Sequence, residues 1–173
     1  MLKKYLIDAD VLIEAKNRHY QFGFCSNFWD WVIAAHMADM LFSIKSVKRQ
    51  IADGKSADEV LQWGARLPNS FFLDDISDID VNSHCRELVK AVQSKTQYKP
   101  QALNVFMDIK NADAWLIAVA KKTDAILITG EVSAPDSKSN IKIPDAAVLV
   151  GVPTTNIFKV LREHAIGQFQ LKR

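Results

Sequence analysis

Acidic side chains occur at three places where an apolar run of the sequence begins or ends. In YLIDADVLI, residues 5–13, Asp8 and Asp10 come directly after a short apolar run. Asp113 precedes the apolar part of NADAWLIAVAKK, and Glu131 stands two residues beyond the run ILIT. Carboxylates that are brought together raise one another's pKa unless a cation neutralises them. If these places meet in the fold, they predict a metal site.

Mg²⁺ and Mn²⁺ are the ions that such a set of oxygen ligands favours. Either ion could activate a water and stabilise charge on phosphate oxygens, so a nuclease is a hypothesis that the acids support. Each acid alone has a simpler interpretation. Asp113 complements a helix N-terminus and Glu131 is a loop charge, whereas Asp8 is harder to explain because burying an unpaired carboxylate is costly. The hypothesis therefore depends on the joint placement of the acids.

Alternating strands and helices are expected to position these acids. The pattern predicts strands at residues 3–8, 41–44, 125–129 and 147–150, with 71–75 as an edge strand or an extended connector. Helices are predicted at residues 10–18, 24–40, 46–53, 57–63, from Asp80 or Ser83 to 94, 100–109, 113–122, and from Thr154 or Thr155 to 164. This alternation predicts an α/β fold with three layers, α/β/α, around a mainly parallel central sheet.

One predicted helix, residues 24–40, is rich in aromatic residues. Its segment FWDWV could offer bases a stacking surface. Helical spacing favours packing against the core instead. The residues expected to face the core are Phe28, Trp31, Val32, Ala35 and Met37.

Length and composition predict a single domain spanning residues 1–173. Apolar residues make up 49% of the chain and charged residues 24%, and the net charge of +2 is too small to indicate a nucleic-acid binder by itself. Cys25 and Cys85 fit no zinc-binding spacing and are expected to be reduced thiols, which favours a cytoplasmic location. The apolar run near the start is too short for a signal peptide. No uncharged apolar run approaches the roughly 20 residues of a membrane span.

The order of these segments resembles that of PIN-domain ribonucleases. YLIDADVLI resembles their opening strand, in which hydrophobic residues precede Asp-x-Asn or Asp-x-Ser, and NADAWLIAVAKK and AILITGE resemble their Asp-bearing helix and their Thr-x-Asp strand end. VKRQI, LQWGARLP, KIPDA and VPTTNIF extend the resemblance, to a prokaryotic PIN-like subfamily, over nearly the whole chain. The resemblance implies a PIN-like fold with a catalytic metal site at Asp8, Asp113 and Glu131, and Thr129 as a supporting hydroxyl.

Two positions depart from the family pattern. PIN domains usually carry a glutamate in the helix after the second strand, where this chain has Gln50. A glutamine oxygen can still hold a metal or its water, but it brings no charge. Asp10 stands where the family usually has Asn or Ser and adds a carboxylate to the expected metal ligands. The alternatives are therefore a Mg²⁺- or Mn²⁺-dependent endoribonuclease and a catalytically impaired scaffold that binds RNA or a protein.

The resemblance also implies partners. RNA is the expected substrate, and the protein is expected to be the toxin of a toxin–antitoxin pair, with a cognate antitoxin protein and a homodimeric assembly. Candidate phosphate contacts are Lys45, Lys48 and Arg49 beside Gln50, and Arg18 and His19 after the first helix, although solvated helix faces also explain each of them.

A haloacid dehalogenase-like phosphatase is the competing interpretation of Asp8-x-Asp10, with the first acid as nucleophile and the second as general acid. That family needs a pair of acids after a lysine beyond its second strand. Beyond Lys138 and Lys142, this chain has only Asp145 before the last predicted strand. The phosphatase is therefore disfavoured.

Overall fold

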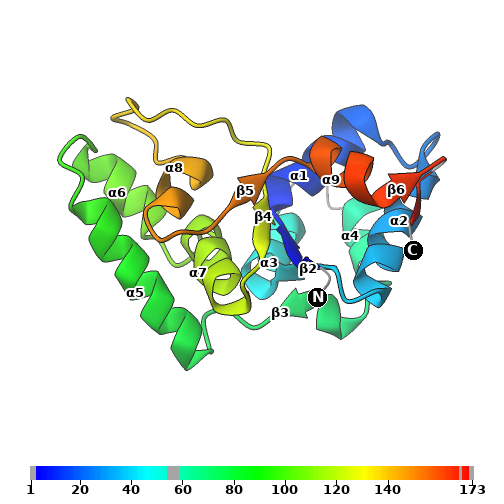
Figure 1. The fold of residues 1–173 in the computed structure, drawn as a ribbon, viewed down its shortest axis with the longest axis horizontal. Coiled ribbons are helices and arrows are strands. Elements are labelled where there is room, and N and C mark those ends of the chain that lie inside the picture. Colours follow the sequence, from blue (N-terminus) through cyan, green and yellow to red (C-terminus); the bar gives the residue numbers. More distant parts are fainter. Residues whose placement is uncertain (1–2, 54–58, 168, 172–173) are drawn as a thin grey trace.

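Five strands form one parallel sheet in the computed structural model, which describes residues 3–53, 59–167 and 169–171 (Figure 1). β1 (Tyr5–Ile7) lies at the centre, between β2 (Leu41–Ile44) and β4 (Ile126–Ile128). β3 (Phe72–Leu73) and β5 (Thr154–Thr155) form the two edges, which gives the order β3-β2-β1-β4-β5. Because all neighbours run parallel, the carboxyl ends of all five strands lie along one edge of the sheet.

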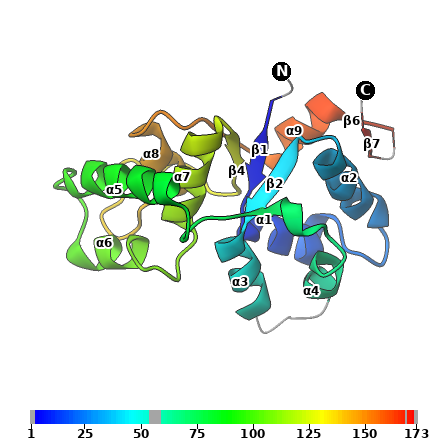
Figure 2. The same ribbon diagram turned by 90° about the horizontal axis from the view of Figure 1, so that it is seen from below.

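Helices cover both faces of the sheet (Figures 1 and 2). Successive residues of β1 point to opposite faces, so Leu6 belongs to one buried cluster and Tyr5 and Ile7 to the other. The Leu6 side is covered by α5 (Ile79–Gln93), α6 (Pro100–Phe106), α7 (Asp113–Thr123) and α8 (Ile143–Val148). The Tyr5 side is covered by α2 (Ser26–Met37), α4 (Glu59–Gly64) and α9 (Ile157–His164). The predicted three-layer α/β/α fold is confirmed, and the sheet is parallel throughout.

The remaining elements extend these layers. α1 (Ala9–Glu14) follows β1 and continues as a π-helical turn, Ala15–His19, while α3 (Lys45–Asp53) follows β2 directly. A short antiparallel ribbon, β6 (Ala165–Ile166) with β7 (Gln170–Leu171), and a 3₁₀ turn, Asn69–Phe71, complete the described chain. Within that part of the chain, no helix combines the length and the apolar character needed to cross a membrane.

The segment after residue 140 differs from the prediction. Residues 147–150 were expected to form the last strand of the sheet, but α8 occupies Ile143–Val148 and the last strand of the sheet is β5. Pro144 lies in the first turn of α8, where a proline costs no helical hydrogen bond. A short apolar run cannot distinguish a buried strand from a buried helix by periodicity alone, which explains the error.

Within α2, the expected packing of the aromatic residues is found, with one exception. Trp29 and Trp31 are 2% and 1% exposed, so they pack in the core and cannot stack on a ligand. Met37 was expected to face the core, but it is 72% exposed at the last residue of the helix. The apolar spacing therefore identified the buried face of α2 and was wrong only at Met37, the residue after buried His36.

The N-cap residues of two helices differ from the predicted ones. Asp78, rather than Asp80 or Ser83, caps α5, and Asn156 caps α9 because the predicted cap residues Thr154 and Thr155 form β5. The predicted start of a helix at Ala57 lies outside the described residues.

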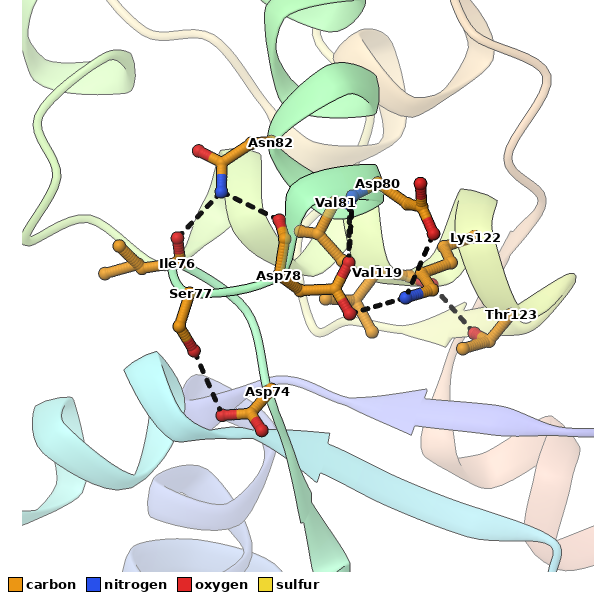
Figure 3. Close-up of polar contacts among 10 residues, drawn as sticks. All are labelled: Asp74, Ile76, Ser77, Asp78, Asp80, Val81, Asn82, Val119, Lys122 and Thr123. Atoms are coloured by element: carbon orange, nitrogen blue, oxygen red, sulfur yellow. Dashed lines mark hydrogen bonds and ion pairs between the residues drawn. The ribbon is translucent and has the colours of Figure 1, made fainter.

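Asp78 fixes the connection between β3 and α5 (Figure 3). Its Oδ1 accepts hydrogen bonds from two backbone N–H groups in the first turn of α5, at 3.0 Å each, and its other oxygen pairs with Lys122 of α7. Lys122 also lies 3.6 Å from a carboxylate oxygen of Asp80. The Nδ2 group of Asn82 donates to the carbonyl oxygens of Ile76 and Asp78, at 2.7 Å each. These contacts join the start of α5 to the end of α7.

Asp78→Ala is expected to lower the melting temperature by about 2–4 °C, because one helix cap is lost in a chain of this size. Asp80→Ala is the matched control, since it removes only the longer ion pair to Lys122, and its effect is expected to stay below about 1 °C. Thermal unfolding followed by circular dichroism measures both. Equal losses in the two variants would contradict the capping role of Asp78.

Candidate active site

Four acids meet at the carboxyl edge of the sheet, and we call Asp8, Asp10, Asp113 and Glu131 the acidic group. Asp8 follows β1 and occupies the N-cap position of α1, and Asp10 lies in the first turn of that helix. Asp113 is the first residue of α7, and Glu131 lies just beyond β4. The charges of Asp113, Asp10 and Glu131 each raise the pKa of Asp8. The structure therefore brings together the acids that the sequence singles out.

Burial makes this group costly to ionise. Asp8 is 3% exposed, and its burial, followed by the charge of Asp113, raises its pKa well above the ordinary value. Burial and the charge of Glu131 raise the pKa of Asp113 to about 6, although a hydrogen bond with Asn111 acts in the opposite direction. Desolvation and the charge of Glu131 also raise the pKa of Asp10. Deprotonation of these carboxyl groups therefore costs more than deprotonation of isolated, solvated ones.

Lys142 supplies positive charge to this group, which the sequence analysis did not foresee. Its Nζ donates to Glu131 Oε1 at 2.7 Å, and the backbone N–H of Ile143 donates to Glu131 Oε2 at 2.6 Å. The hydrogen bond to Glu131 raises the pKa of Lys142, so the ammonium stays charged at neutral pH. Its charge in turn lowers the pKa of Asp10 and of Asp113. Lys142 thus offsets part of the repulsion among the carboxylates.

Glu14 is a further acid that the sequence analysis missed. It lies one helical turn after Asp10 and raises the pKa of that residue. Its Oε2 would lie 3.5 Å from a Cβ added at Gly130, so the side chain lies beside the turn that carries Glu131. Arg18 pairs with Glu14 at 3.4 Å. The spacing of four residues from Asp10 was the signal that could have revealed it.

Thr129 lies where the sequence analysis expected a supporting hydroxyl. The residue is buried, and its Oγ1 accepts a hydrogen bond from the backbone N–H of Glu131 at 3.1 Å. This bond closes a tight turn at the end of β4. Thr129 therefore orients the backbone that presents Glu131 to the acidic group.

Gln50 lies on α3, the helix that follows β2, and is partly buried. Within residues 3–53, 59–167 and 169–171, no hydrogen bond links it to any of the four acids. Lys45 and Lys48, predicted RNA contacts, line a separate cavity of about 790 Å³ that none of the acids borders. Arg49, the third of these contacts, is 4.0 Å from Asp75. The structure thus places Arg18 beside the acidic group, through Glu14, and Lys45 and Lys48 along another surface.

A second, smaller cavity of about 240 Å³ adjoins the acidic group. Thr129, Gly130 and Glu131 form one wall of it, and residues of α1, the π-helical turn and α9 form the others. The cavity is open to solvent beside exposed Val132 and Phe158. Glu131 is the member of the acidic group that borders this cavity.

The chemistry of the acidic group suits a hard divalent cation, because every side chain in it offers carboxylate oxygens. In the described chain, no three His, Cys, Asp or Glu side chains already stand in an arrangement that could hold a metal ion. Glu131 in particular directs its two oxygens to Lys142 and Ile143. A divalent cation would thus compete with Lys142 for Glu131.

A parallel α/β/α fold with clustered acids at the carboxyl end of its central strand defines the class of this protein. Within that class, a family model described as Domain of unknown function (DUF4411) matches residues 5–167, and the chain belongs to this family. The match includes the whole acidic group and Lys142. No curated protein matches the sequence.

Proposed function

We propose that this protein is a metal-dependent endoribonuclease of the PIN-domain type. The observation that carries the proposal is the placement of Asp8, Asp10 and Asp113 at the carboxyl edge of the sheet, where burial and neighbouring charges raise their pKa values. A divalent cation would remove the repulsion among these carboxylates. The resemblance of the three acid-bearing segments to PIN domains supports an RNA phosphodiester as the substrate.

Asp8, Asp113 and Glu131, together with Asp10, would hold Mg²⁺ or Mn²⁺. When bound, such an ion supplies activation of a water and stabilisation of charge on the phosphate oxygens. The residues of the chain orient this site. Thr129 holds the turn that presents Glu131, and Asp8 is fixed at the junction of β1 and α1. The ammonium of Lys142 is a local positive charge that favours the approach of a phosphate.

We further propose that the protein is the cytoplasmic toxin of a toxin–antitoxin pair, bound by an antitoxin protein and able to form a homodimer. Apolar side chains at the end of α6 support a protein partner. Val105, Met107 and Ile109 are 65%, 37% and 57% exposed within five residues of one another. Neighbouring exposed apolar side chains are typical of surfaces that another chain covers.

A second candidate function is a catalytically impaired PIN-like scaffold that binds RNA or a protein. It is favoured by the engagement of both Glu131 oxygens with Lys142 and Ile143. Gln50 supports it as well, because it stands where the PIN-domain pattern has a glutamate and it brings no charge. On this alternative, Lys142 permanently replaces the metal.

A manganese titration with cleavage of single-stranded RNA as readout tests the proposal. The wild type is expected to cleave only with Mn²⁺ present. Lys142→Met is expected to reach half-maximal cleavage at about fivefold lower Mn²⁺, because about 1 kcal/mol of ion pairing no longer opposes the metal. Lys138→Met, an exposed lysine of the same loop, is the control and should leave the titration unchanged.

The two functions give opposite results in this titration. Absence of Mn²⁺-dependent cleavage in both the wild type and Lys142→Met would contradict the ribonuclease. RNA binding that persists in EDTA in the same preparations would then favour the scaffold.

A further inference from the structure

The cavity beside Glu131 has an aromatic wall that hydrolysis at the acidic group does not require. His19 and Tyr20 reach it from the end of the π-helical turn, and Phe158 reaches it from the first turn of α9. Glu131 lines the same cavity of about 240 Å³. The aromatic rings and Glu131 of the acidic group therefore share one concave surface.

These rings are held in defined positions. Tyr20 stacks on the buried ring of Phe28, with centroids 4.3 Å apart and planes inclined by 19°. His19 and Phe158 meet edge to face, with centroids 5.4 Å apart and planes at 82°. Phe158 remains 42% exposed despite this contact. Phe158 therefore offers an exposed aromatic surface on which a further ring could stack.

The aromatic wall continues into a neighbouring cavity of about 360 Å³. Tyr20 and Phe158 line both cavities, and the second one also contains Arg162 and Phe169. The aromatic surface thus extends beyond the first cavity, and a guanidinium group lies in the second one. A single-stranded nucleic acid combines flat bases with negative phosphates.

Asn156 gives the first cavity a polar edge. The helix cap uses only its Oδ1, which accepts a hydrogen bond from the N–H of Lys159 at 3.0 Å. The amide nitrogen is a donor that the cap does not need. Hydrogen bonds to the edge of an unstacked base are a usual part of single-strand RNA recognition.

We propose that His19, Tyr20 and Phe158 form a nucleobase subsite that holds a base of single-stranded RNA beside the phosphate at the acidic group. This inference rests on the proposed ribonuclease function and adds single-strand selectivity to it. A base within a duplex is already stacked and paired, so it cannot enter the cavity. Stacking accepts any base, so the subsite is expected to impose little sequence preference.

Binding of a short fluorescent oligoribonucleotide, measured by anisotropy in EDTA, tests the subsite without any cleavage. The wild type is expected to bind the single strand at least about tenfold more tightly than the same sequence in a duplex. Phe158→Ala is expected to weaken single-strand binding by about 5- to 150-fold, the range that base–aromatic stacking explains. Phe158→Tyr keeps an aromatic face and should bind like the wild type.

Two further variants separate stacking from packing. Phe158→Leu keeps an apolar side chain without a π face, so it should lose affinity almost as Phe158→Ala does. Phe24→Ala removes another phenylalanine that is 70% exposed but lines neither cavity, and it should change nothing. Unchanged affinity in Phe158→Ala, full affinity in Phe158→Leu, or a wild-type preference for the duplex would each overturn the subsite.

Failure of the nucleobase subsite and failure of the ribonuclease proposal give different results. If the wild type shows no Mn²⁺-dependent cleavage but binds single strands through Phe158, the ribonuclease is wrong and the subsite stands. If cleavage occurs and Phe158→Ala changes neither binding nor cleavage, the subsite is wrong and the ribonuclease stands.

Discussion

Asp8→Asn is expected to abolish Mn²⁺-dependent RNA cleavage without destabilising the chain. Asp8 is the most buried carboxylate of the acidic group, and its pKa is raised well above the ordinary value by burial and by Asp113. Mutation of a residue that only supports a metal ligand lowers metal affinity or activity by about 10- to 100-fold, so loss of a ligand should lower the cleavage rate by more than about 100-fold. The melting temperature should be equal to that of the wild type or higher, because an amide avoids the cost of burying a charge.

Asp39→Asn is the matched control for this variant. Asp39 lies before β2, at the opposite end of the sheet, and its side chain is 74% exposed beside Lys4. Its φ of 57° lies in the left-handed region, which asparagine also tolerates. Cleavage and melting temperature should therefore stay unchanged. If Asp8→Asn cleaves RNA as the wild type does, Asp8 is no metal ligand.

The sequence was sufficient to predict the carboxyl edge of the sheet because its signals there are local. Three uncharged residues followed by Asp8 predict a buried strand that ends in an acid, and the structure places β1 at Tyr5–Ile7. Asp113 at the start of an apolar helix and Glu131 after β4 follow from the same kind of pattern. Parallel pairing of β1 with β4 then brings these acids to one edge.

The partners of the acidic group could not be predicted in the same way. Lys142 reaches Glu131 across eleven positions of chain that contain a polar loop, and no periodicity fixes how such a loop returns. α8 holds the loop, since Asp145 accepts a hydrogen bond from the N–H of Ala134 at 2.8 Å. The sequence did not predict this helix and instead indicated a strand at residues 147–150, so it could not place Lys142.

The family pattern was also an incomplete guide to the site. The position expected to carry a glutamate is Gln50, and it lies on α3 without a hydrogen bond to the described acids. Glu14 instead adds negative charge beside Asp10 and Gly130. A carboxylate can reach one edge of a sheet from several neighbouring helices, so spacing to a family motif does not identify which helix supplies it.

Without divalent cations, the free energy of unfolding is expected to fall as the pH rises from about 4 to about 6. Asp113 has an ordinary pKa of 3.8 and a pKa of about 6 in the folded chain, so the folded chain binds its proton more tightly than the unfolded chain. Below pH 3.8, Asp113 is protonated in both states and its raised pKa does not affect the free energy of unfolding. Above pH about 6, the raised pKa lowers the free energy of unfolding by about 3 kcal/mol. Asp8, whose pKa is also raised, extends the fall in the same direction.

Chemical denaturation in EDTA at several pH values, compared between the wild type and Asp113→Asn, measures this effect. The exposed carboxylates Asp74 and Glu87, which pair with lysines, have lowered pKa values, so they make the free energy of unfolding rise with pH. Both proteins contain them, so their effect cancels when the two proteins are compared. The variant should gain stability over the wild type as the pH rises. A parallel dependence in both proteins would contradict the electrostatic coupling of the acidic group.

Manganese is expected to remove this pH dependence in the wild type. An ion that binds only the folded chain at about 100 times its dissociation constant adds about 2.7 kcal/mol, which is close to the amount by which Asp113 lowers the free energy of unfolding. The increase in the free energy of unfolding that Mn²⁺ causes should grow with pH, because the ion binds the deprotonated carboxylates. If the fall between pH 4 and 6 occurs but Mn²⁺ leaves it unchanged, the acids repel one another as described and do not bind the metal.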